Sequence, residues 1–341
     1  MPSHPTPQRG GTPYSPRGRR SPPPTPWPLV SPLPAIGIDL GGTDIKGAVV
    51  SDTGEILTQD KVPTHPETGA EGVADRITGL AEALSQKQGI PLGEMAGVGV
   101  GVPGVTRKDG TVVIAPNLEW HHVPFKQMLA DRLLDASVEL DNDANVAALA
   151  EARAGVGNGC ESLALLTLGT GIGGGIVING RVHHGSSYSA GEIGHMVVLP
   201  DGPPCGCGKA GCLEAISATK GMVNFARQQL DKGTPTVLSH QDRLTPKSIC
   251  DAAALGDVVG QKTLAHVAKY IGIAVANLIN ILSPDVIAIG GGISAAGTLI
   301  LDPIVDSARI NTLEGMFEHT RIELAVLGND AGSIGAAYLV M

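Results

Sequence analysis

A histidine and three cysteines lie close together in a glycine- and proline-rich part of the chain. They are His195, Cys205, Cys207 and Cys212. One imidazole nitrogen and three thiolate sulfurs make a closed tetrahedral set for Zn²⁺, as in structural zinc sites. A disulfide would leave one thiol unpaired, and ordinary core cysteines would not gather in a loop with so few apolar neighbours. We therefore predict structural zinc in a loop over 195–212, which holds Glu192 and Glu214 at a fixed separation.

A glycine turn near the start of the folded region has residues suited to phosphate binding. The alternating apolar residues at 36–40 and 45–50 predict two strands joined by a tight turn. Glycine amides can approach an anion closely, while a hydroxyl and an ammonium group add donors and a carboxylate could hold Mg²⁺ through water. These candidate residues are Asp39, Gly41, Gly42, Thr43 and Lys46. A hairpin follows the glycines, which excludes a Walker A loop or a Rossmann fingerprint but leaves an ordinary hairpin as an alternative.

The same strand–glycine–strand pattern returns at 161–180, more than a hundred residues later. Two such units suggest two similar domains facing each other, each with a hairpin that cradles phosphate. A third glycine group ends the predicted strand 285–293, where a flat ring or a phosphate could approach the backbone. The candidates from these two stretches are Gly169, Thr170, Gly171, Gly291 and Gly292. Gly332 and Gly335 in the last predicted helix favour close packing there, with adenine contact as the alternative.

The segment D-N-D-A-N opens an alanine-rich helix after a predicted strand. Asp141, Asn142 or Asp143 would each serve as the helix N-cap. Three candidates exceed the need of one cap, so a carboxylate remains at a strand-to-helix junction, where α/β folds bind ligands. We predict that Asp143 is a general base. Asn117, in a loop after a proline, is either a turn residue or a donor and acceptor for a sugar hydroxyl.

The remaining pattern alternates helices and strands, which predicts an α/β protein. Predicted helices cover 71–89, 124–134, 217–229, 246–256, 257–282, 297–309 and 333–340. Further strands are predicted at 97–102, 112–114, 137–140 and 321–327. The long apolar helix 257–282 is expected to be a buried core element.

Composition narrows the class of protein. The 341 residues include 42% hydrophobic ones, enough for two domains, which we expect at 35–140 and 141–341. The net charge of −9 argues against nucleic acid or an anionic membrane as partner. We expect a cytoplasmic protein without a membrane span, because no long uninterrupted apolar run occurs. Residues 1–34 contain 12 of the 25 prolines and are predicted to be a disordered tail, or the product of a start site placed too far upstream.

Five motifs occur in a fixed order along the chain. They are D-L-G-G-T-D-I-K, D-N-D-A-N-V-A-A-L-A-E, L-G-T-G-I-G-G-G-I, G-E-I-G-H and C-G-C-G-K-A-G-C-L-E. From about Ile36 to the C-terminus the chain resembles the ROK family of bacterial repressors, open reading frames and sugar kinases, particularly its glucokinases. The resemblance implies an actin-like, ribonuclease-H-like fold of two α/β domains with a cleft between them. It also implies a homodimer, and it allows the C-terminal helix to pack back on the N-terminal domain.

The resemblance also implies roles for individual residues. Asp143 would accept the proton of the sugar's primary hydroxyl, with Mg²⁺ accompanying ATP. The residues that would face the sugar, glucose or a related hexose, are Asn117, Asn142, Glu192, His195 and Glu214. The glycine hairpins would hold phosphates, and Gly291 and Gly292 would lie near adenosine. The family's zinc ligands match the four residues identified above, so that His195 would face zinc with one ring nitrogen and sugar with the other.

Several alternatives to a glucose kinase remain open. The substrate could be N-acetylglucosamine, N-acetylmannosamine or fructose, because the sequence does not measure pocket size. The donor could be polyphosphate, although such a donor calls for a basic track that the acidic balance disfavours. A sugar-sensing repressor would carry a helix-turn-helix module of roughly 60 to 80 residues ahead of the first motif. Only a proline-rich stretch precedes it here.

Overall fold

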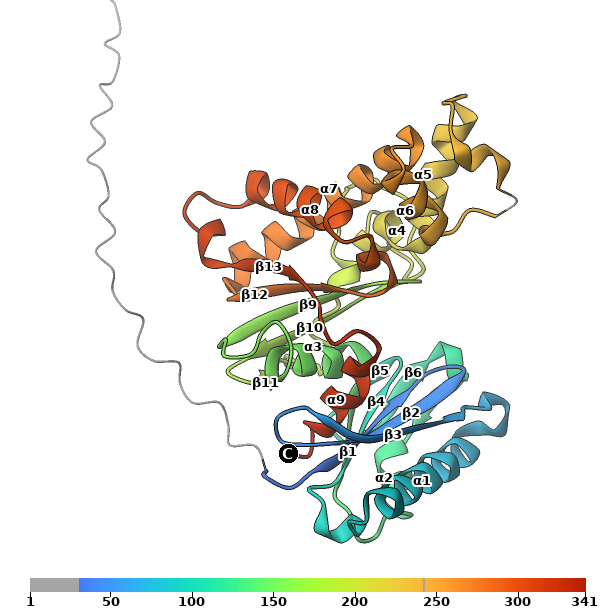
Figure 1. Ribbon diagram of the computed structural model, residues 1–341, viewed down its shortest axis with the longest axis vertical. Coiled ribbons are helices and arrows are strands. Elements are labelled where there is room, and N and C mark those ends of the chain that lie inside the picture. The colour runs from blue at the N-terminus through green and yellow to red at the C-terminus, as the bar shows by residue number, and fades with distance from the viewer. Residues whose placement is uncertain (1–30, 242) are drawn as a thin grey trace, which may run out of the picture.

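The computed structural model describes residues 31–241 and 243–341 (Figure 1). The predicted disordered segment lies outside these residues except for its last four positions. There the backbone N–H of Ser31 donates to the carbonyl of Met341 (2.8 Å), and the carbonyl of Pro34 accepts from the N–H of Ala96 (2.9 Å). The beginning and the end of the described chain therefore lie side by side.

Five strands form an N-terminal sheet in the order β3-β2-β1-β4-β8. They are β1 (Ala35–Leu40), β2 (Asp44–Val50), β3 (Ile56–Pro63), β4 (Val98–Val102) and β8 (Val138–Asn142). β1, β4 and β8 are parallel, while β2 and β3 continue the sheet antiparallel. Helices α1 (Gly69–Gln88) and α2 (Phe125–Ala130) cover one face with buried aliphatic side chains. A small separate sheet contains β5 (Val105–Thr106), β6 (Val112–Ala115) and β7 (Trp120–Val123).

The C-terminal sheet repeats this arrangement in the order β11-β10-β9-β12-β13. Its strands are β9 (Ser162–Leu168), β10 (Ile172–Ile178), β11 (Arg181–Val182), β12 (Val286–Gly290) and β13 (Arg321–Leu324). The strand directions also repeat, because β9, β12 and β13 are parallel and β10 and β11 antiparallel. The prediction of two similar α/β domains is therefore confirmed.

Five helices pack over the outer face of the C-terminal sheet and complete the larger core. They are α4 (Leu213–Ser217), α5 (Thr219–Asp231), α6 (Pro246–Ala254), α7 (Val258–Leu282) and α8 (Thr298–Asn311). Within the described residues α7 is long and apolar enough to cross a membrane by length and composition alone, but 61% of that stretch is buried inside the protein. Its hydrophobicity is accounted for by packing against α6 and α8, as predicted for a core helix.

Two helices occupy the space between the sheets (Figure 1). α3 (Asp143–Arg153) packs on β9 and β10, whereas the C-terminal α9 (Ala331–Ala337) packs on β1 and β4 of the N-terminal sheet. The two helices also touch each other, and this contact requires glycine. A Cβ on Gly335 would lie 1.7 Å from the carbonyl oxygen of Val146. The predicted close packing at this glycine is therefore confirmed.

Some predicted elements are shorter or divided. α2 ends at Ala130, because the chain turns at Arg132, whose N–H donates to the carbonyl three residues back. The single helix expected at 217–229 is preceded by α4, and an extended residue, Ala218 (ψ 176°), separates α4 from α5. β12 ends at Gly290, since Gly291 takes a left-handed φ of 86°. Each difference is a local backbone event that hydrophobic periodicity does not register.

Candidate active site and metal centre

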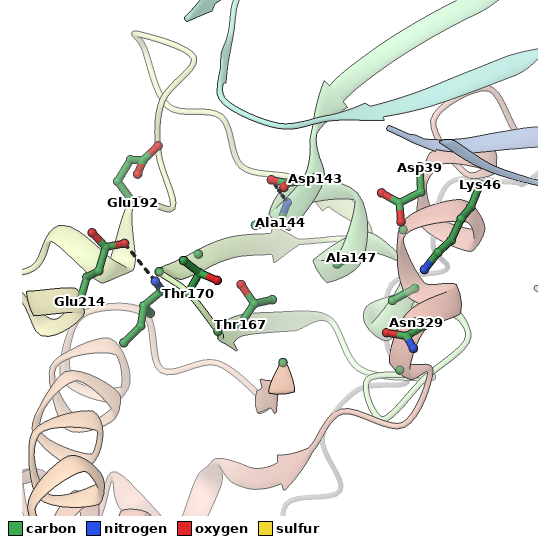
Figure 2. A pocket seen from close by; sticks show the side chains of 18 of the residues that line it. Asp39, Lys46, Asp143, Ala144, Ala147, Thr167, Thr170, Glu192, Glu214 and Asn329 are labelled. Atoms are coloured by element: carbon green, nitrogen blue, oxygen red, sulfur yellow. Dashed lines mark hydrogen bonds between the residues drawn. The ribbon is translucent and has the colours of Figure 1, made fainter. Parts of the chain in front are cut away.

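A cavity of about 510 Å³ lies in the cleft between the two sheets (Figure 2). Its walls come from the ends of β1 and β9, the starts of α3, α4 and α9, and the loop before the cysteines. The predicted site residues that line it are Asp39, Lys46, Asp143, Gly169, Thr170, Gly171, Glu192, His195, Glu214 and Gly291. Figure 2 shows Asp143 between the Asp39 and Lys46 pair on one side and the two glutamates on the other. The fold thus brings together residues from both domains.

Asp143 does not serve as the helix cap, because its neighbour takes that role. The side-chain oxygen of Asn142 accepts from the N–H groups of Ala144 (2.9 Å) and Asn145 (3.2 Å), so Asn142 is the N-cap of α3. Solvent reaches the Asp143 carboxylate from the cleft, but the surrounding walls remove much of its hydration. This loss of hydration, together with the smaller effect of the nearby charge of Asp39, raises the pKa of Asp143 to about 6 against the opposing hydrogen bond from the N–H of Ala144.

Asp39 and Lys46 are paired across the first hairpin, in register on β1 and β2. Burial raises the pKa of the Asp39 carboxyl, and the positive charge of Lys46 partly offsets this by lowering it. The start of α9 closes over the pair. A Cβ on Gly332 would lie 2.6 Å from Cγ of Asp39, so any larger residue there would displace this carboxylate. Gly332 thus has the predicted packing role and also lines the cavity.

The tip of the second hairpin is held from below by α4 and α5. The N–H and the hydroxyl of Thr219 both donate to the carbonyl of Gly169, at 3.0 and 2.9 Å. The carboxylate of Glu214 accepts from the N–H of Ile172 at 3.0 Å (Figure 2). Gly291 approaches the same hairpin so closely that a Cβ would lie 2.4 Å from the carbonyl oxygen of Leu168. These contacts fix the glycine turn that borders the cavity.

The predicted zinc ligands converge on one point. The ligand atoms of His195, Cys205, Cys207 and Cys212 all lie within 4.8 Å of one another. The sulfurs of Cys207 and Cys212 are 3.7 Å apart, and Cys205 Sγ is 3.7 Å from His195 Nδ1. A tetrahedral zinc site with Zn–S bonds of about 2.3 Å has ligand separations of roughly 3.8 Å. The residues therefore fit Zn²⁺, and all three cysteines are free thiols rather than members of a disulfide.

The ring of His195 faces the cysteines and the cavity at the same time. Its Nδ1 is the nitrogen near Cys205, while its Nε2 lies 3.9 Å from the Glu192 carboxylate. His195 closes the short helical turn Ile193–His195, and Glu192 begins it, so both project from one rigid segment. This arrangement is compatible with one nitrogen on a metal and the other directed at a ligand in the cleft.

Other predicted residues lie outside this cavity. Asn117 is exposed beside Gly42 at the tip of the first hairpin, whose Gly41 and Thr43 also do not line the cavity. Gly292 is exposed as well. Asn142 lines a small adjoining hollow that shares Glu192 with the main cavity, and its amide nitrogen donates to the carbonyl of Gly104 (2.8 Å).

Sequence reasoning missed several lining residues. They include Ala144, Ala147, Thr167, Gly173, Gly328, Asn329 and Ala331. The two hairpins align so that Thr167 corresponds to Asp39, and this alignment is the sequence feature that could indicate Thr167 as a lining residue. Asn329 lines the same cavity as Lys46 (Figure 2), yet nearly three hundred residues separate them in the chain, so no local pattern could indicate it.

The chain is similar to known sugar kinases along nearly its whole described length. A family model described as ROK family matches residues 35–341. A glucokinase from Halalkalibacterium halodurans is 38% identical, over 89% of this chain and 94% of that protein. The structure of a ROK family glucokinase from Streptomyces griseus, in complex with glucose and AMPPNP, matches with a TM-score of 0.74 and 37% identity, covering 90% of this chain and 98% of that one. A ROK hexokinase from Thermus thermophilus matches with a TM-score of 0.78 and 33% identity, covering 90% and 97%.

Proposed function

This chain belongs to the ROK family, and we propose that it transfers the γ-phosphate of ATP to glucose with Asp143 as the general base. It is an ATP-dependent sugar kinase with the actin-like fold of two α/β domains. The observation that supports the assignment of the base is the place of Asp143 in the cavity, between residues of both domains. Its pKa of about 6 keeps it mainly ionised at neutral pH while leaving it basic enough to accept a proton.

The chemical step needs one proton acceptor and a well-placed phosphate. The primary hydroxyl oxygen of glucose attacks the γ-phosphorus as its proton passes to the Asp143 carboxylate. The bond between γ-phosphorus and the bridging oxygen breaks, and ADP leaves with that electron pair. Because such transition states are loose, positioning and charge neutralisation provide most of the acceleration. Closure of the two domains would exclude water as a competing acceptor.

The two hairpins are suited to the phosphates. The turn at Gly169–Gly171 would offer the backbone amides of Thr170 and Gly171 and the Thr170 hydroxyl, because the N–H of Gly169 already donates to the carbonyl of Gly171. Lys46 would offer positive charge from the N-terminal domain. Asp39 would hold Mg²⁺ through water, and this ion would neutralise charge on the phosphates when bound. The approach of Gly291 to the second hairpin supports its assignment to the adenosine side.

The sugar would lie between Asp143 and the loop with the cysteines. Glu192, Glu214 and His195 line that end of the cavity and offer acceptors for several hydroxyls. Zn²⁺ held by His195 and the three cysteines would keep these groups at fixed separations without taking part in the chemistry. Asn142, whose amide is already hydrogen-bonded, and Asn117, which is exposed, would touch the sugar only from the rim of the site. We also propose that the protein is a homodimer, on the basis of the family resemblance. We propose a cytoplasmic location because ATP is the donor.

A coupled ADP-release assay with Mg·ATP tests this function. We expect glucose to be the preferred substrate in a panel with N-acetylglucosamine, N-acetylmannosamine and fructose. Asp143→Asn should lower kcat by at least about a hundredfold, since the amide cannot accept the proton. The surface variant Asp251→Asn on α6 serves as the matched control and should keep full activity. Full activity of Asp143→Asn would exclude the general base, and another preferred sugar would correct only the substrate.

A further inference from the structure

The small hollow beside the main cavity contains an unused hydrogen-bond acceptor. It has a volume of about 20 Å³ and is lined by residues that include Asn142, Asn145, Tyr188 and Glu192. A void of roughly 10–15 Å³ admits one water-sized group. Asn145 is 6% exposed, and its side-chain oxygen has no hydrogen-bond partner among the described residues. An unpaired buried acceptor is costly, so a donor should reach it in the working state.

The orientation of this amide is set by Asp141. The NH₂ group of Asn145 donates to Asp141 Oδ1 at 3.0 Å, and Asp141 itself is 1% exposed. Because a carboxylate only accepts hydrogen bonds, the amide cannot turn its oxygen toward Asp141. The oxygen of Asn145 is therefore fixed as an acceptor away from that carboxylate.

Asp141 is held in turn by two other groups. The N–H of Asn142 donates to its Oδ1 at 2.7 Å, and Nε2 of His184 lies 2.6 Å from its Oδ2. The ring of His184 stacks on that of Tyr188 at 3.9 Å, and the carbonyl of His184 accepts from the N–H of Ala190 (3.0 Å). The loop that leads to Glu192 is thereby closed and anchored beside Asn145.

The hollow adjoins the place assigned to the hexose. Glu192 lines both the hollow and the main cavity, so a ligand next to Glu192 reaches the mouth of the hollow. Asn142, the other amide there, already uses its oxygen for the helix cap and its nitrogen for Gly104. We infer that Asn145 is a further substrate-binding residue, whose side-chain oxygen accepts a hydrogen bond from a ring hydroxyl of the hexose. This inference rests on the proposed sugar site and adds a determinant of hydroxyl specificity to it.

Calorimetric titration of the full chain tests the contact without depending on turnover. The Kd values of glucose and of its 2-, 3- and 4-deoxy analogues are measured for the wild type and for Asn145→Ala. We expect Asn145→Ala to weaken glucose binding about 5- to 10-fold. For one analogue, the one that lacks the contacted hydroxyl, wild type and variant should bind equally, because the same hydrogen bond cannot be lost twice. If Asn145→Ala weakens the binding of all three analogues by the same factor as it weakens glucose binding, the inference is overturned.

Two further variants keep the test decisive. Asn158→Ala, at an exposed asparagine, is the matched control and should bind like the wild type. If Asn145→Ala does not fold, Asp141→Asn replaces it, since an amide at 141 accepts either orientation of Asn145. Asp141→Asn should then weaken glucose binding by a smaller factor and should not weaken the binding of the one analogue that lacks the contacted hydroxyl. If it weakens the binding of all three analogues as much as that of glucose, the contact is refuted. The ADP-release assay is read separately, so wild-type protein that binds glucose without phosphorylating it refutes the proposed reaction and leaves the Asn145 result standing.

Discussion

The N–H of Ile172 donates to the carboxylate of Glu214 at 3.0 Å, which joins the first turn of α4 to the tip of the second glycine hairpin. Cys212, the N-cap residue of α4, is buried and lies two positions before Glu214. The other oxygen of Glu214 is 3.7 Å from Cys205 Sγ. The cysteine loop and the second glycine hairpin are therefore parts of one connected unit.

Removal of the metal should consequently affect both substrates. We expect about one zinc per chain by elemental analysis, and we expect Cys212→Ser to abolish it, because the three remaining ligands do not close the tetrahedron. KM for glucose and KM for Mg·ATP should both rise, the latter through the Glu214–Ile172 contact. Cys250→Ser, in α6 and away from the loop, is the matched control and should retain zinc. Unchanged zinc content in Cys212→Ser would refute the proposed ligand set.

Activity should fall on the acid side of neutrality. The base must be ionised to accept the proton, and the pKa of Asp143 is raised to about 6. The value of kcat/KM for glucose should therefore rise with pH up to about 6 and level off above it, because this profile reports the ionisation of the enzyme before glucose binds. A log kcat/KM profile for glucose between pH 4.5 and 8 at saturating Mg·ATP measures it. If kcat/KM instead falls only around pH 4, the acid limb of the profile would show that the cleft does not raise the pKa of Asp143. Solvent still reaches this carboxylate, so screening limits any effect on folding stability.

Asp39→Asn should change the donor side and the pH profile together. Loss of this carboxylate removes the proposed contact to Mg²⁺, so KM for Mg·ATP should rise by about tenfold or more. The same change removes a negative charge that raises the pKa of Asp143, and the acid limb should move to lower pH. Glucose binding by calorimetry is the control and should stay near the wild-type value. An unshifted limb would show that Asp39 and Asp143 are electrostatically independent.

Two glycine substitutions should have opposite effects on stability. Gly335→Ala places a Cβ 1.7 Å from the carbonyl oxygen of Val146 and should destabilise the protein by about 1–3 kcal/mol or more, because the helices must separate. Gly79→Ala, on the exposed side of α1 with no atom within 4 Å, should stabilise it by about 0.5–1 kcal/mol. Urea unfolding measures both. Equal midpoints for Gly335→Ala and wild type would contradict the contact between α3 and α9.

Local sequence patterns determined much of the site. The alternation around the two glycine turns predicted both hairpins, and the excess of polar residues before α3 predicted a carboxylate that is not needed as the helix cap. The structure identifies Asn142 as that cap. The spacing of one histidine and three cysteines predicted a metal centre, and the four side chains converge as that pattern requires. These features are readable because each is formed by residues near one another in the chain.

The tertiary structure decided everything that depends on distant segments. The side-chain nitrogen of Asn142 donates to the carbonyl of Gly104, and that of Asn145 donates to Asp141. These distant partners decide which atoms of the two amides remain available to a ligand. Asn329 lines the same cavity as Lys46, and Gly332 packs against Asp39, only because the end of the chain returns to the first sheet. The periodicity of apolar residues along the chain does not predict such contacts, because they arise from packing between elements. The sequence therefore determined which groups are available for chemistry, and the packing of α3 and α9 between the two sheets decided which of them share the cleft.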